Sequence, residues 1–113
     1  MTDFQRLTEW LRAGSSEPLD MRWSDMRNIT LHGANLQGCE FDFANFENSK
    51  INSCDFSNCR LNNVVVENAD WEGNDLTGAD FTGSRLRMTK FSGCTVTEST
   101  NFTGVSSYMA QGL

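Results

Sequence analysis

One apolar residue in every five is the feature that most constrains this chain. From residue 21 to residue 96 every fifth position is apolar, sixteen times without a gap, although only 38% of the chain is hydrophobic. A period of five matches neither an α-helix, with about 3.6 residues per turn, nor a β-strand, with an alternation of about two. A fixed short period instead indicates a repeat architecture. We name these positions the centres: Met21, Met26, Leu31, Leu36, Phe41, Phe46, Ile51, Phe56, Leu61, Val66, Trp71, Leu76, Phe81, Leu86, Phe91 and Val96.

The other four places of the five-residue unit also have a fixed character. Two residues before each centre stands a mostly small residue, such as Ala34, Cys39 or Ser49, and the residues on either side of the centre are mostly polar. The place two after the centre is rich in Gly and Asn, which tolerate positive φ and tight turns. Each unit therefore predicts one flat side followed by a corner. Such a chain closes after four sides, so a coil takes about twenty residues.

The repeat closely resembles the unit of the pentapeptide-repeat family, which reads roughly A-[DN]-[LF]-x-x. Residues 34–36, 44–46, 54–56, 69–71 and 79–81 read ANL, ANF, CDF, ADW and ADF, and glycines occupy several corners. The resemblance covers about 80 of the 113 residues. It implies an all-β solenoid, a right-handed quadrilateral β-helix of about four coils, roughly 20 Å long at ~4.8 Å per rung.

Residues twenty apart should stack in columns along this solenoid. One such column contains Leu31, Ile51, Trp71 and Phe91. Because an indole is large for this column, we expect a local bulge at Trp71 and a hydrogen-bond partner for its N–H.

The two ends of the chain depart from the five-residue period. Residues 2–13 have apolar residues at helical spacing, with a Thr2–Gln5 capping box and Gly14 as terminator, so they predict a short amphipathic α-helix that covers the N-terminal end. We divide the chain into a capping helix and linker (1–18), the β-helix (19–104) and a C-terminal segment (105–113). After Val96 the register slips by one residue, and 101–104 form a displaced last unit. The final segment is expected to be a cap or a homodimer contact, which leaves monomer and dimer open.

The composition limits which ligands the protein can bind and where in the cell we expect it. The net charge of −6 argues against direct nucleic-acid binding. All four cysteines stand at the small inward place, so we expect free, space-filling thiols rather than a metal site or a disulfide, although Cys39 and Cys59 should lie within disulfide range. With no long apolar run and no signal-like N-terminus, we expect a cytoplasmic protein with no membrane contact.

The sequence contains no catalytic set. The single histidine, His32, follows a centre and is expected to be a solvated surface group. Nucleophile, zinc-protease and phosphate-loop motifs are missing, and a filled solenoid has no interior cavity. We therefore expect neither an enzyme nor a cofactor.

The distribution of charge is the first indication of function. Residues 40–80 contain nine acids and two bases, a net charge of −7. We name the nine acids the acidic belt, and they are the candidate partner-binding residues: Glu40, Asp42, Glu47, Asp55, Glu67, Asp70, Glu72, Asp75 and Asp80.

The acidic belt leads to the first functional hypothesis. Regularly spaced carboxylates can imitate the phosphates of duplex DNA, and several members of the pentapeptide-repeat family are understood as such mimics, including those that protect topoisomerases from quinolones. The resemblance thus implies an inhibitor that blocks the basic DNA-binding site of its partner. That partner would be a CRISPR or restriction complex, as for a small phage-type inhibitor, or a topoisomerase. The opposing interpretation is that outward acids are simply typical of the repeat.

A second hypothesis is a structural or effector scaffold. Trp23 and Phe43 occupy corners twenty residues apart and should stack on the outside. We expect the N-terminal helix or linker to fold back over them; the alternative is an exposed aromatic column that recruits a protein partner. The C-terminal tail is the other candidate surface for such a scaffold.

Overall fold

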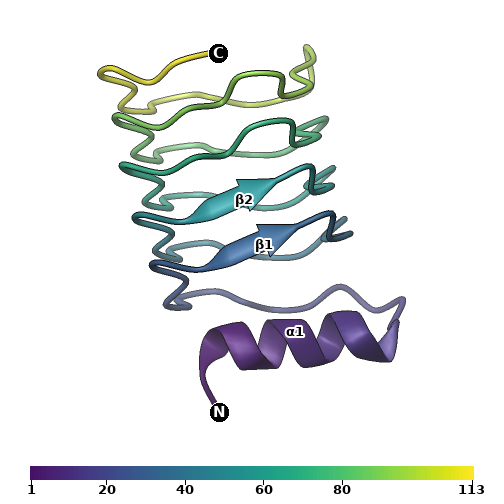
Figure 1. Cartoon of the computed structure of the whole chain (residues 1–113). Helices are drawn as coiled ribbons and strands as arrows, with labels where there is room; N and C mark the ends of the chain where they lie inside the picture. Colours follow the sequence, from purple (N-terminus) through teal and green to yellow (C-terminus); the bar gives the residue numbers. More distant parts are fainter.

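The computed structural model, which describes residues 1–113, is a four-sided β-solenoid with one helix across its N-terminal end (Figure 1). Parallel bridges join residues that lie twenty apart in the sequence, or 21 apart beyond Thr95, and the bridged residues form four columns. We number the four sides of the solenoid after these columns: side 1 contains Asp20, Glu40, Arg60, Asp80 and Asn101; side 2 contains Asp25, Asn45, Val65, Arg85 and Ser106; side 3 contains Thr30, Lys50, Asp70, Lys90 and Gln111; side 4 contains Asn35, Asp55, Asp75 and Thr95. The predicted solenoid architecture is confirmed.

Regular strands are confined to side 3. There β1 (Thr30–His32) pairs in parallel with β2 (Lys50–Asn52), and Leu31 lies opposite Ile51. Elsewhere each side keeps a single bridged residue, because a corner interrupts the chain every five residues. The backbone hydrogen bonds therefore run mainly between coils, parallel to the axis along which the coils stack (Figure 1).

The centres fill the interior. All fifteen from Met21 to Phe91 are buried, and only Val96, at 43% exposed, is not. Trp71 stacks on Phe56 at 4.8 Å between ring centroids, and its indole N–H donates to Ser49 Oγ at 2.9 Å, so the expected partner exists. The expected bulge is wrong: Asp70, beside Trp71, keeps its bridges to both neighbouring coils. The small Ser49 leaves room for the indole.

Several polar side chains also point inward, at the small place of the unit. Ser84 is an example: its hydroxyl accepts from the Val64 N–H at 3.0 Å and donates to the Leu61 carbonyl at 2.6 Å, one coil away. Asn74 and Thr89 make the same two contacts with their own preceding coil. At each of these turns the backbone N–H and carbonyl bond to the inward side chain of the following coil instead of to each other. The interior polar side chains therefore link adjacent coils.

The four cysteines are free, and three of them are fully buried. Cys59 donates through its Sγ to the Leu36 carbonyl at 2.9 Å. Burial raises the pKa of the Cys59 thiol to about 12, so it stays protonated at neutral pH. These thiols behave as small interior groups, in agreement with the sequence interpretation.

The N-terminal helix, α1 (Asp3–Ala13), forms for the reasons that the sequence supplies. Thr2 and Gln5 make the reciprocal capping box, and Gly14 ends the helix in the left-handed conformation, at φ 66°. Leu7 is completely buried in the core of the solenoid, and Phe4, Trp10 and Leu11 pack against that core. At eleven residues and with a polar face, α1 is not a helix that could cross a membrane.

The C-terminal segment continues the ladder of the solenoid. Ser106 bridges Arg85 and Gln111 bridges Lys90, so a partial fifth coil follows with a spacing of 21 residues. The sequence pattern does not show this continuation, because Ser107 and Gly112 stand where apolar centres would be. The boundary at residue 105 therefore does not mark the end of the solenoid.

Candidate protein-binding surface

The nine carboxylates of the acidic belt are spread over all four sides of the middle coils. Their positions follow from the repeat, because each stands immediately before or after a buried centre and must point outward. Only Glu72 is exposed; the others are half-buried or, for Asp42, buried at 7% exposure. Most of the belt thus lies against neighbouring coils rather than standing free in solvent.

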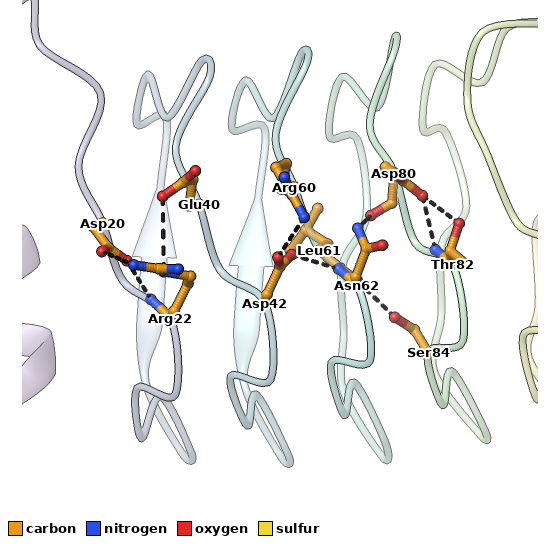
Figure 2. A network of polar contacts seen from close by, with 10 residues as sticks. All are labelled: Asp20, Arg22, Glu40, Asp42, Arg60, Leu61, Asn62, Asp80, Thr82 and Ser84. Atoms are coloured by element: carbon orange, nitrogen blue, oxygen red, sulfur yellow. Dashed lines mark hydrogen bonds and ion pairs between the residues drawn. The ribbon is translucent and has the colours of Figure 1, made fainter.

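On side 1 the acids are engaged in a polar network along the ladder (Figure 2). Asp42 Oδ2 lies 3.0 Å from Arg60 Nη2, and its Oδ1 accepts from the Asn62 N–H at 3.0 Å. One coil earlier, Arg22 pairs with Asp20 at 2.8 Å and approaches Glu40 at 3.8 Å. Two arginines, Arg22 and Arg60, thus offset part of the charge of the acids on this side.

The acids of side 2 are also partly neutralised. Glu67, whose side chain is 13% exposed, lies 3.0 Å from Arg85 and 3.7 Å from Arg87. Glu47 accompanies it on this side and makes no ion pair. The sequence analysis missed these ion pairs, but a signal exists: three of them join residues eighteen apart, one after a centre and one before the centre of the next coil.

Sides 3 and 4 differ from the first two because their acids form no ion pair. Asp70 still stands in a column between Lys50 and Lys90, which offset its charge. Side 4, residues 34–38, 54–58, 74–78 and 94–100, contains no Lys, Arg or His at all. We name Asp55, Asp75 and the adjoining Glu72, which precedes Asp75 across the Gly73 corner, the acidic patch.

Local hydrogen bonds hold the side-4 carboxylates in place. Asp55 accepts from the Ser57 N–H at 2.8 Å, and Asp75 accepts from the Thr77 N–H at 3.0 Å and from its hydroxyl at 2.7 Å. The Thr77 hydroxyl and amide lower the pKa of Asp75, so this carboxylate remains ionised well below neutral pH. The two aspartates of the acidic patch are therefore held in fixed positions.

The aromatic pair, Trp23 and Phe43, is exposed. The two rings stack at 4.2 Å with an interplanar angle of 6°, and Trp23 is 73% and Phe43 45% exposed. The expected cover by the helix or linker is wrong, because α1 seats its apolar side on the end of the solenoid instead. Both residues have positive φ, 65° and 64°, which is costly for bulky side chains.

Groups that could support catalysis or metal binding do not come together. No three His, Cys, Asp or Glu side chains lie close enough to hold a metal ion. His32 is exposed, as expected, and no carboxylate or hydroxyl contacts its imidazole. The surface presents uncompensated carboxylates on side 4 and two stacked aromatic rings at a corner of the first two coils.

The sequence matches the family model of the pentapeptide repeat region over residues 24–102, which is more than half of the chain. The chain belongs to the pentapeptide-repeat family. No curated protein sequence matches it significantly.

Solved pentapeptide repeat proteins have a similar fold. A protein from the Arabidopsis thaliana thylakoid lumen is 25% identical, with a TM-score of 0.76 over 81% of this chain and 63% of that one. Rfr23 from the cyanobacterium Cyanothece 51142 is 21% identical, with a TM-score of 0.51 over 88% of this chain and 67% of that one. This pentapeptide repeat protein thus spans less than two thirds of the length of the thylakoid protein. Both likenesses support the β-solenoid fold.

A further neighbour in this family is QnrB1, a plasmid-mediated fluoroquinolone resistance protein. It is 17% or less identical, and its TM-score is at most 0.40. A likeness this weak carries no argument about what the present pentapeptide repeat protein binds.

Proposed function

We propose that this pentapeptide repeat protein is a non-catalytic binding protein whose acidic patch imitates DNA and occupies a basic DNA-binding site of its partner. The partner would be a protein or complex that handles nucleic acid in the cytoplasm. The observation that carries the proposal is side 4, where Asp55 and Asp75 succeed one another without any cation on the same side.

Three features support a DNA mimic over a merely acidic surface. Asp55 and Asp75 stand one rung, about 4.8 Å, apart, so their charges form a short row. Neither is offset by an ion pair, unlike Asp42 and Glu67. Both are fixed by hydrogen bonds, so little conformational entropy is lost when a rigid, basic surface binds them.

The test removes charge without changing shape. Asp55→Asn, Asp75→Asn and Glu72→Gln keep the oxygen acceptors, and Asn already fills the equivalent place at Asn35 and Asn45, where its side chain accepts the same turn hydrogen bond. The readout is displacement of a DNA duplex from purified gyrase, a restriction enzyme and a CRISPR effector at low and high salt. We expect salt-sensitive displacement from at least one of them, weakened about tenfold or more in the triple variant.

The matched control removes three charges from the N-terminal end through Glu9→Gln, Glu17→Gln and Asp20→Asn. It should displace DNA as well as the unmodified protein does. Equal loss in both variants would indicate a dependence on net charge alone. Unchanged displacement in the acidic-patch variant would reject the proposal.

A second candidate function, a scaffold that recruits a protein through the aromatic pair, is favoured by one observation. Trp23 and Phe43 occupy strained, exposed corners where the same column continues with Asn63 and Gly83. Trp23→Asn with Phe43→Asn would relax the corners while removing the rings. Partner binding lost in this variant and kept in the acidic-patch variant would select the scaffold.

A further inference from the structure

The first coil of the solenoid has backbone groups that face no other coil. In each later coil, the bridged residue points its N–H and C=O toward the preceding coil: Lys50 N–H donates to the Ile29 carbonyl at 2.9 Å, and Glu40 N–H to that of Leu19 at 3.0 Å. The equivalent groups in the first coil belong to Asp20, Asp25, Thr30 and Asn35. They point toward the N-terminal end, where no further coil exists.

The helix satisfies one of these groups on each of two sides. Asp3 Oδ2 accepts from the Asp25 N–H at 2.7 Å, and Arg6 Nη1 donates to the Asp20 carbonyl at 2.9 Å. No such partner reaches sides 3 and 4. The backbone groups of Thr30 and the N–H of Asn35 make no hydrogen bond toward the N-terminal end of the solenoid. Both residues are exposed.

The opposite edge of β1 is already used, so the free groups are not shared with β2. Ile51, opposite Leu31, donates its N–H onward to Asp70 at 2.9 Å, away from β1. Backbone N–H and C=O groups alternate in direction along a strand. Thr30 and His32, on either side of Leu31, therefore direct theirs away from β2, toward the N-terminal end of the solenoid. The free edge of β1 is an unpaired strand edge without a proline or a charged residue to block it.

A groove adjoins this free edge at Leu31 and His32. It has a volume of about 480 Å³, between the end of α1 and β1, and its apolar lining comes from Trp10, Leu11, Leu31 and Ala34. No acid, Lys or Arg lines it. Figure 1 shows how α1 lies beneath β1 at this end of the stack.

We propose that the free edge of β1 binds an extended peptide segment of a partner protein, which adds as a strand beside Thr30–His32. The peptide backbone would pair with the free N–H and C=O groups of β1, and one apolar side chain would enter the groove beside Trp10 and Leu11. An extended peptide fits because its backbone offers alternating donors and acceptors, whereas a helix has already paired its own. The uncharged lining of the groove favours a neutral, apolar side chain over a charged one.

This site shares no residue with the acidic patch, although Asn35, which lines the groove, bridges Asp55 of the patch. Peptide binding at the free edge of β1 does not depend on the role proposed for the acidic patch.

The test begins with peptides selected from a random decapeptide phage library against the whole chain. Their binding is measured by fluorescence anisotropy, and their contacts by amide chemical-shift changes. We expect shifts at Thr30–Asn35 and at the Trp10 indole. N-methylation of alternate peptide amides should abolish binding, while methylation of the intervening amides should not.

Two variants of the protein sharpen the result. Thr30→Pro removes one free N–H that no internal hydrogen bond uses, and should weaken the selected peptides about fivefold to tenfold. Thr30→Val keeps that N–H and should bind as the unmodified protein does. Because Pro could disturb the fold, Ser15→Trp, at an exposed residue lining the groove, tests the same site by filling it.

Three outcomes would overturn the proposal. The first is that no peptide is selected, and the second is that the shifts map to Trp23 and Phe43 instead. The third is self-association, seen by sedimentation and lost in Thr30→Pro, because the edge would then belong to a second copy of this chain.

Discussion

The two ends of this solenoid are finished in different ways. At the N-terminal end α1 closes the core with Leu7 and supplies Asp3 and Arg6 to the unpaired backbone of the first coil. At the C-terminal end the ladder continues through Ser106 and Gln111 while the apolar centres are gone. The backbone ladder and the apolar core are therefore separable, because backbone pairing continues at Ser106 and Gln111 although the centres that follow them are not apolar.

The largest predicted difference between the ends is in core burial. Leu7→Ala should lower the free energy of unfolding by about 2–5 kcal/mol, because it leaves a cavity under the helix. Leu113→Ala, at a residue that is 52% exposed, should change it by less than about 0.5 kcal/mol. Urea unfolding measures both, and equal effects would contradict the asymmetry.

The next effect concerns the backbone cap. Asp3→Ala leaves the Asp25 N–H without its acceptor and should cost about 1 kcal/mol. Asp3→Asn retains an acceptor oxygen and should recover most of that loss. Amide hydrogen exchange at Asp25 is the measurement, and protection that persists in Asp3→Ala would show that the carboxylate is not the cap.

A smaller effect, of opposite sign, is expected at the C-terminal end. Met88 and Met109 stack in a corner column at positive φ, 59° and 57°, where Asn28, Asn48 and Asn68 stand in earlier coils. Met88→Asn should stabilise the protein by about 0.5 kcal/mol, because Asn adopts this conformation at lower cost. A lower melting temperature would mean that the exposed Met pair packs better than its 50% and 59% exposure indicates.

Acid should loosen the N-terminal end before the other, with the smallest energetic effect of the four. Hydrogen bonds and ion pairs from Arg22 and Arg27 lower the pKa values of Asp20 and Asp25 to about 2. Since these values lie below the unfolded value of about 4, the stabilisation is complete above pH 4 and is lost as the pH falls toward 2.

The columns that begin with Asp20 on side 1 and Asp25 on side 2 end in Asn101 and Ser106, which do not titrate. Hydrogen-exchange protection should therefore fall in the first coil between pH 4 and pH 2 and stay level in the fifth. Asp20→Asn with Asp25→Asn is the control that should remove the difference. A uniform loss along the chain would contradict the prediction.

Much of the fold followed from the sequence because one rule, an apolar residue every fifth position, fixes which groups face inward. That rule also placed Trp23 against Phe43, whereas α1 was predicted from its helical spacing and its capping box. The rule failed at Ser107 and Gly112, where pairing survives without an apolar centre.

The candidate surface was less predictable. Outward direction could be read from the period, but exposure could not, because Asp42 and Glu67 fold down onto arginines of the following coil. Asp42 and Glu67 are offset by the residues eighteen positions later, a distance with no meaning in the five-residue unit alone. The free edge of β1 left no sequence signal, since it arises from where the helix stops covering the first coil.

One extra residue between Thr95 and Asn101 has a practical consequence. The spacing of bridges changes there from 20 to 21, yet Phe81 N–H still donates to the Asn101 carbonyl at 2.8 Å, and Thr100 anchors the longer corner through the Leu76 carbonyl at 2.8 Å. The scaffold thus accommodates added length at this corner without disturbing the coil that follows. Guest loops for new recognition surfaces are best grafted here.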